Sequence, residues 1–158
     1  MAPLDFFREY VEPAVALWRE RPSLPVLAVG AIAQIDTLAE IVALDQAGGS
    51  LPRGGAASYR DGLGEREPAL ARIRDAHDSH KHGRLSRASA VEISQGQRAY
   101  PSAGTGFFVD DAFVDDGFLG DTSTAILLND GTPLDISALV SDAMEAWDRE
   151  LRRLAYMT

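Results

Sequence analysis

The stretch from Leu24 to Ala47 constrains the fold more than any other part of the sequence, because it is long, apolar and almost free of charge. Its apolar residues recur at helical spacing, and its only charged residues are Asp36, Glu40 and Asp45. A helix with so few polar positions must be covered on more than one side, so we expect it to be the central helix of a bundle. Its longest apolar run, Pro25–Ala33, is well short of the roughly 20 residues that cross a bilayer, so no membrane is expected as a partner.

The composition is that of one globular domain. Of the 158 residues, 46% are hydrophobic and 25% are charged, and there is no cysteine. The absence of cysteine excludes a disulfide scaffold, thiol catalysis and cysteine-ligated zinc. The net charge of -9 argues against a protein that coats nucleic acid over its whole surface. The N-terminus has no basic segment followed by an apolar run, so a cytoplasmic location is expected.

Three further segments have the apolar periodicity of helices, namely Pro3–Arg21, Glu65–His82 and Ile136 to about Tyr156. Pro13 lies inside the first and is expected to kink or split it, because proline removes a backbone donor. Pro68 lies in the first turn of the second, where proline is well tolerated. Residues 48–57 are expected to form a flexible loop, and Tyr59–Leu63 a short helical turn.

The periodicity changes after Gly83. Ala90–Ser94 alternates between apolar and polar residues, and Thr124–Leu128 is rich in strand-forming residues. Asn129–Gly131 is typical of a hairpin turn, so Thr132–Leu134 is expected to be a short third strand.

We therefore predict an α+β fold, in which a bundle of three to four long helices is joined to a small antiparallel sheet of two or three strands. Residues 1–158 are expected to form a single domain, helical over 1–83 and strand–loop–strand–helix over 88–158. Residues 100–122 form its longest predicted loop. No cofactor is expected, because the Gly-rich stretches at Gly62–Gly64 and Gly104–Gly106 lack the lysine and the strand–helix context of a phosphate loop.

All three histidines lie in the segment Arg72–Arg87, together with five basic residues and only two acidic ones. On a helix, His77 and His80 extend the inner apolar stripe toward the C-terminal end, where the helix dipole favours a protonated imidazole. Two basic residues, Arg74 and Lys81, flank this stripe. The candidate site residues are therefore Arg74, His77, His80 and Lys81.

Two interpretations of this segment need no nucleic acid. In the first, the histidines are half-buried structural residues beside a solvated charge ladder, Arg74–Asp78–His82. In the second, His77 and His80 bind a metal with a third ligand from elsewhere, such as Glu65 or an aspartate of residues 110–116.

A third interpretation is a site for nucleic acid or a nucleotide at this basic, His-rich helix end. Arg74 or Lys81 would bind phosphate. His77 or His80 would act as an acid–base group, since imidazole titrates near neutral pH.

The segment Arg74–Leu85, RDAHDSHKHGRL, resembles the R-D-x-A-N-A-x-K-H-x-x-L segment of uncharacterised bacterial proteins of similar length. Those proteins also end in a strand–DG–strand–helix unit that contains tryptophan, here ILLNDGTPLDISALVSDAMEAWDREL. The chain departs from their pattern at His77, where they have a small residue, and at Asp78, where they have asparagine.

The same helix is similar to the motif of HEPN domains, the helical bundles of many toxin and defence ribonucleases, in which arginine is followed by four to six residues and then histidine. Arg72 and His77 fit with four intervening residues, and Arg74 and His80 fit with five. The resemblance implies that Arg74 contacts the scissile phosphate and that His80 is the acid–base group. It also implies that a symmetric homodimer completes the site.

The expected function is that of a bacterial HEPN-like protein that binds or acts on RNA or a nucleotide in a defence or toxin-type system. The alternative is a non-catalytic, dimeric protein-interaction module. A metal-binding protein that uses the His77 and His80 helix is the third hypothesis.

Overall fold

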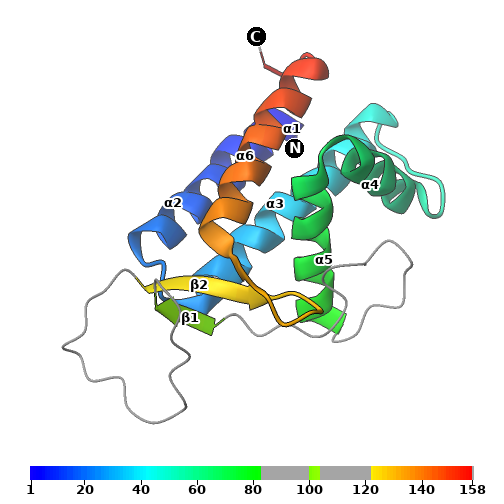
Figure 1. The fold of residues 1–158 in the computed structure, drawn as a ribbon. Coiled ribbons are helices and arrows are strands. Elements are labelled where there is room, and N and C mark those ends of the chain that lie inside the picture. Colours follow the sequence, from blue (N-terminus) through cyan, green and yellow to red (C-terminus); the bar gives the residue numbers. More distant parts are fainter. Residues whose placement is uncertain (83–99, 104–121, 158) are drawn as a thin grey trace.

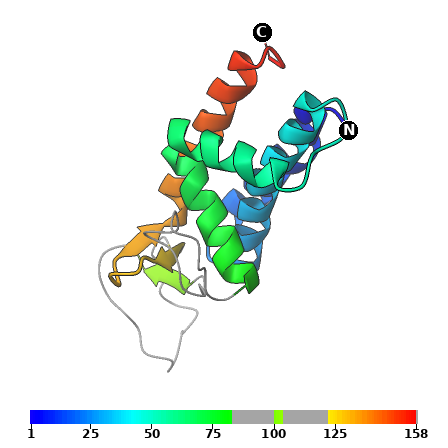
Figure 2. The ribbon, with the colours of Figure 1, turned by 90° about the vertical axis from the view of Figure 1, so that its right-hand side faces the viewer.

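A computed structural model describes residues 1–82, 100–103 and 122–157 (Figure 1). The helical elements are α1 (Pro3–Phe6), the π-helical turn η1 (Phe7–Val11), α2 (Glu12–Glu20), α3 (Pro25–Gln46), α4 (Gly55–Arg66), α5 (Pro68–His82) and α6 (Ile136–Arg153). The strands are β1 (Tyr100–Ala103), β2 (Thr122–Leu127) and β3 (Pro133–Asp135). This architecture confirms the predicted α+β fold, with a helical bundle and a small antiparallel sheet at one end of it (Figures 1 and 2).

Helix α3 is the centre of the bundle, as its composition predicts. It contacts every other helical element, from α1 and η1 to α6. Its buried side chains are Ala28, Ala31, Ile32, Ile35, Asp36, Leu38, Ala39, Val42 and Ala43. Trp147 of α6 packs against this helix and donates a hydrogen bond from its indole nitrogen to the carbonyl oxygen of Ile35 at 3.1 Å. The largest side chain of α6 is thus both buried and hydrogen-bonded, as buried polar groups require.

Within the described ranges, α3 is the one helix long and apolar enough to cross a membrane. Half of its most apolar stretch is buried inside the protein, and core helices of bundles share this length and composition. The cytoplasmic location stays a prediction.

The break expected at Pro13 takes the form of a π-helical turn. Glu12 donates its backbone N–H to the carbonyl oxygen of Phe7, five residues back, and Pro13 follows in the first turn of α2. Proline has no N–H and cannot donate the next backbone hydrogen bond of the helix. The wider π-helical turn accommodates this loss, and the helix continues as α2.

Helix α4 corrects the prediction for residues 48–66. The sequence predicts a loop to Ala57 and one helical turn at Tyr59–Leu63, but α4 already begins at Gly55 and runs for 12 residues. Its glycine content suggests a loop, yet one of these glycines is required for packing. A Cβ atom at Gly64 would lie 3.0 Å from the Cβ of Ala71, so this glycine allows α4 to approach α5 closely.

The sheet has the order β1-β2-β3, and both pairs are antiparallel. The hairpin predicted at Asn129–Gly131 is confirmed, since β3 pairs with β2 directly after this turn. The strand at Tyr100–Ala103 falls where the sequence predicts a long loop, which corrects that boundary. The strand predicted at Ala90–Ser94 and most of the predicted loop lie outside the described residues.

A buried carboxylate, Glu150, joins α6 to α4. Only 2% of its surface is exposed. It accepts hydrogen bonds from Arg153 at 2.7 and 2.8 Å, from Arg66 at 3.0 Å and from the Tyr59 hydroxyl at 3.3 Å. The bonds from Arg153 and Arg66 hold the pKa of Glu150 below its ordinary value. Burial, together with the neighbouring carboxylate, raises the pKa of Tyr59, which therefore stays a donor.

Helix α6 ends in a Schellman motif. The N–H of Tyr156 bonds to the carbonyl of Leu151, and the N–H of Ala155 bonds to that of Arg152. Ala155 carries the left-handed conformation of this motif, with φ of 60°, a region that favours glycine.

We predict that Ala155→Gly stabilises the protein by about 0.5–1 kcal/mol, because glycine adopts the left-handed conformation without the Cβ penalty. Urea denaturation would measure the change. The matched control is Ala16→Gly, at an exposed position inside α2, where the same substitution is expected to destabilise by about 0.5–1 kcal/mol. Equal effects of the two changes on stability would show that the left-handed conformation of Ala155 carries no cost at the end of α6.

We predict that Glu150→Gln lowers the free energy of unfolding at pH 7 by about 2 kcal/mol, because three donors lose a charged acceptor. The lowered pKa of Glu150 means that its stabilisation is complete above the ordinary carboxyl range and is lost as the pH falls through the lowered value. Thermal unfolding between pH 7 and pH 2 should therefore show a smaller acid-induced loss in the variant. Glu145→Gln, at an exposed position of the same helix, is the control and should leave the acid profile unchanged.

Candidate functional site

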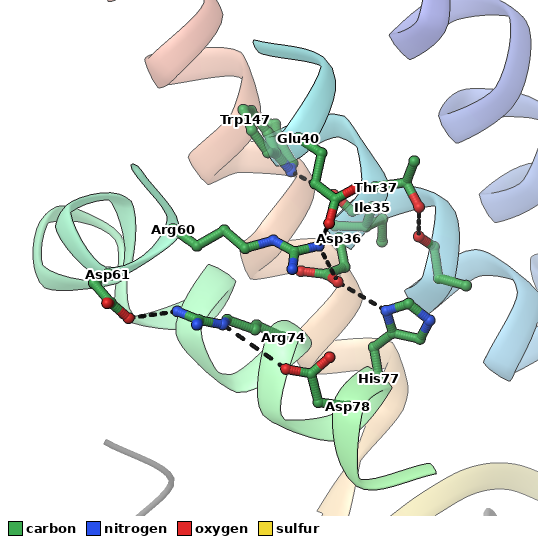
Figure 3. Close-up of polar contacts among 11 residues, drawn as sticks. Ile35, Asp36, Thr37, Glu40, Arg60, Asp61, Arg74, His77, Asp78 and Trp147 are labelled. Carbon is green, nitrogen blue, oxygen red and sulfur yellow. Dashed lines mark hydrogen bonds and ion pairs between the residues drawn. The ribbon is translucent and has the colours of Figure 1, made fainter. Parts of the chain in front are cut away.

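The candidate site is centred on Asp36, a buried carboxylate in the middle of α3. Only 3% of its side chain is exposed. Its Oδ2 atom accepts hydrogen bonds from Nδ1 of His77 at 2.7 Å and from the guanidinium group of Arg60 at 2.8 Å (Figure 3). The two donors come from α5 and α4, so this one oxygen joins three helices. A buried carboxylate is stable only with such partners.

The contact with Asp36 fixes the protonation pattern of the His77 ring. An ionised carboxylate only accepts hydrogen bonds, so Nδ1 of His77 carries a proton. In the neutral ring, Nε2 on the opposite side then has the free lone pair (Figure 3). About one fifth of the His77 side chain is exposed, so the ring is held in place and still reachable. Such a carboxylate-oriented imidazole can accept a proton from a bound molecule.

His80 lies on the same cavity as His77. The cavity has a volume of about 20 Å³ and lies where α3, α5, β2 and α6 meet. Its lining residues are Val29, Ile32, Ala76, His77, His80, Ile126 and Ile136. Two imidazole groups therefore border one small, otherwise apolar cavity, as the helical spacing of the two residues predicts.

The structure places Arg74 apart from His80. The Arg74 guanidinium bonds to Asp61 of α4 at 2.6 Å and lies 3.9 Å from Asp78, so the first step of the predicted charge ladder is a loose contact. Arg74 lines a second cavity of about 10 Å³, together with Asp36 and Arg60. The pair of residues implied by the HEPN resemblance is thus not brought to one cavity.

Lys81 is exposed in the last turn of α5, one helical turn beyond His77. It lines neither of the two cavities.

A group of possible metal ligands differs from the predicted one. One ligand atom each from Asp36, His77 and Asp78 lies within 4.8 Å of the others. The predicted set combined His77 and His80 with Glu65 or an aspartate of residues 110–116. Glu65 is exposed on α4, and residues 110–116 lie outside the described part of the chain.

Comparison with family models, curated proteins and solved structures finds no match for this chain. The site is therefore interpreted from its own geometry and chemistry.

Asp36 and Arg60 are the two site residues that the sequence analysis does not identify. A signal for Asp36 is present, since it is a charge near the centre of the most apolar helix, and a charge there must face a partner. No comparable signal marks Arg60, because its helix resembles a loop in composition. Its position opposite Asp36 depends on tertiary packing.

We predict that Asp36→Asn lowers the free energy of unfolding by about 3 kcal/mol, because it removes the buried one of the two carboxylates that pair with Arg60. Urea denaturation would measure the loss. Glu40→Gln is the matched control. Glu40 also pairs with Arg60, at 3.1 Å, but 52% of its side chain is exposed, so its loss should cost about 0.5 kcal/mol or less. Similar stabilities for the two variants would show that the site does not depend on the buried carboxylate of Asp36.

Proposed function

We propose that this protein is a ribonuclease-like enzyme that cleaves RNA phosphodiester bonds by acid–base chemistry at His77 and His80. The observation that carries the proposal is that His77, oriented by the buried Asp36, shares one cavity with His80. A general base and a general acid on the two sides of a reacting phosphate are what this cleavage needs.

The reaction assigns one role to each residue. Nε2 of His77 removes the proton from a ribose 2′-hydroxyl, and the 2′-oxygen attacks the adjacent phosphorus. The bond from phosphorus to the 5′-oxygen breaks, and a protonated His80 gives its proton to that leaving oxygen. The products are a 2′,3′-cyclic phosphate and a 5′-hydroxyl. Lys81 contacts the phosphate as its negative charge is redistributed.

The HEPN resemblance supports the substrate class but not every role that it implies. It assigns phosphate binding to Arg74, whereas the guanidinium group of Arg74 is engaged by Asp61 at 2.6 Å. Lys81 replaces it in this proposal. The local excess of basic residues in the segment Arg72–Arg87 supports an anionic substrate in a chain with a net charge of -9.

A dimeric interaction module is the second candidate function, favoured by exposed apolar side chains near the α2–α3 connection. The exposed residues there are Leu17 at 49%, Leu24 at 41% and Val26 at 73%. Exposed apolar side chains are candidates for a protein contact. Light scattering on Leu17→Glu and on the wild type would test it, since loss of a wild-type dimer in the variant supports this function.

We predict that His77→Ala and His80→Ala each lower the rate of RNA cleavage by about 10²–10⁴-fold, the usual contribution of an acid–base group. The measurement is cleavage of a labelled single-stranded RNA, with detection of the 2′,3′-cyclic phosphate. His82→Ala is the matched control, since His82 is exposed on the same helix and lines neither cavity. It should retain the wild-type rate.

The mechanism also requires the 2′-hydroxyl, so a 2′-deoxy substitution at the cleavage position should stop the reaction. Thermal denaturation of each variant separates a lost role in chemistry from a lost fold. A wild-type protein that does not cleave RNA, or equal rates for His80→Ala and His82→Ala, would contradict the proposal.

A further inference from the structure

We propose that a divalent transition-metal cation, with Zn²⁺ as the best fit, binds to Asp36, His77 and Asp78. The three residues supply one imidazole nitrogen and two carboxylate oxygens from two adjacent helices, α3 and α5. These ligand atoms lie within 4.8 Å of one another. Three protein ligands and one open position are typical of zinc sites that exchange a ligand.

The geometry is close to that of a zinc site. Three ligands on a tetrahedral zinc ion, each about 2.0–2.1 Å from the metal, lie roughly 3.4 Å apart. Nδ1 of His77 and Oδ2 of Asp36 are already 2.7 Å apart. The remaining gap is on the side of Asp78, which is 17% exposed and would turn from its contact with Arg74 toward the metal. An imidazole ligand favours zinc over magnesium, which prefers oxygen ligands and retains its water.

The two arginines beside the ligands have other partners that they keep when the metal binds. Arg60 contacts Asp36, but it also pairs with Glu40 at 3.1 Å. Arg74 lies near Asp78, but its shortest ion pair is with Asp61 at 2.6 Å. Each guanidinium group therefore stays paired after its other carboxylate turns to the metal.

The charges around His77 also favour a divalent cation. On α3 they are Asp36 and Glu40, on α4 they are Arg60 and Asp61, and on α5 they are Arg74 and Asp78. Four carboxylates thus face two guanidinium groups, which leaves two negative charges when the imidazole is neutral. A divalent cation balances them. Lys81 lies one turn further along α5 and is exposed to solvent.

Metal binding changes the tautomer of the neutral His77 ring. The N–H bond at Nδ1 breaks and its electron pair forms the bond to zinc, while Nε2 takes up a proton from solvent, so the ring stays neutral and no net proton is released. The hydrogen bond from Nδ1 to Asp36 is lost at the same time. If the proposed ribonuclease function holds, on which this consequence rests, zinc inhibits cleavage because His77 no longer has Nε2 as its free, oriented base.

The test is calorimetric titration of the metal-free 158-residue chain with Zn²⁺, in two buffers that differ in ionisation enthalpy. We expect one zinc per chain and no net release of protons, so the measured binding enthalpy should be the same in the two buffers. Asp78→Asn should weaken binding at least about tenfold, the loss that follows even when a residue that only supports a ligand is removed. His77→Ala should do the same, and circular dichroism would confirm that both variants are folded.

The control is the double variant His80→Ala/His82→Ala, which removes the exposed histidines of α5 and leaves the proposed ligands intact. It should bind zinc as the wild type does. Absence of zinc binding to the wild type would overturn the proposal. So would binding that is lost in the double variant and unchanged in Asp78→Asn, since the metal would then be held by surface histidines. This titration contains no RNA. Its result therefore tests the metal site even if the cleavage assay shows that the protein is not a ribonuclease.

Discussion

The fold depends on how one buried carboxylate in its central helix is stabilised. Asp36 is a charge inside a helix that is otherwise almost entirely apolar, and burial of an unpaired carboxylate would cost far more than a bundle of this size can offset. Arg60 and His77 meet that requirement through a single oxygen atom, at 2.8 and 2.7 Å. Since the two partners belong to α4 and α5, the positions of these helices relative to α3 are determined together with the geometry of the candidate site.

Glu150 of α6 is a second buried carboxylate with charged partners, and it binds residues of α4 in the same way. It is 2% exposed and is surrounded by Arg66, Arg153 and Tyr59. Helix α4 is thus held by a polar contact on each side, one to α3 and one to α6. This explains how a segment with three glycines inside its helical span persists as a helix, because tertiary contacts outweigh its low intrinsic propensity.

The parts of the fold that the sequence predicts are those with local signals. Pro25 and Pro68 begin α3 and α5 where proline is tolerated, Asp135 caps α6 through the N–H of Ser137, and Asn129–Gly131 forms the hairpin turn. The placement of His77 and His80 along one cavity follows from helical spacing, although only His77 is half-buried and His80 is exposed.

The features that the sequence does not predict depend on distant residues. Asp36 and His77 are 41 positions apart, and Arg60 approaches them from a helix whose composition indicates a loop. Periodicity identifies a buried face, but it does not say which residue of another helix lies opposite. Packing also decides that His77, and not Arg74, lines the same cavity as His80, since both residues fit the helical spacing.

The histidine cavity has walls from both ends of the chain. Its aliphatic lining combines Val29 and Ile32 of α3 with Ile126 of β2 and Ile136 at the start of α6. During synthesis on a ribosome, the N-terminal helices emerge first and can associate before the remaining walls exist. The cavity is closed only after Ile126 and Ile136 have emerged, so a chain truncated before them would carry both imidazoles without the pocket that they border.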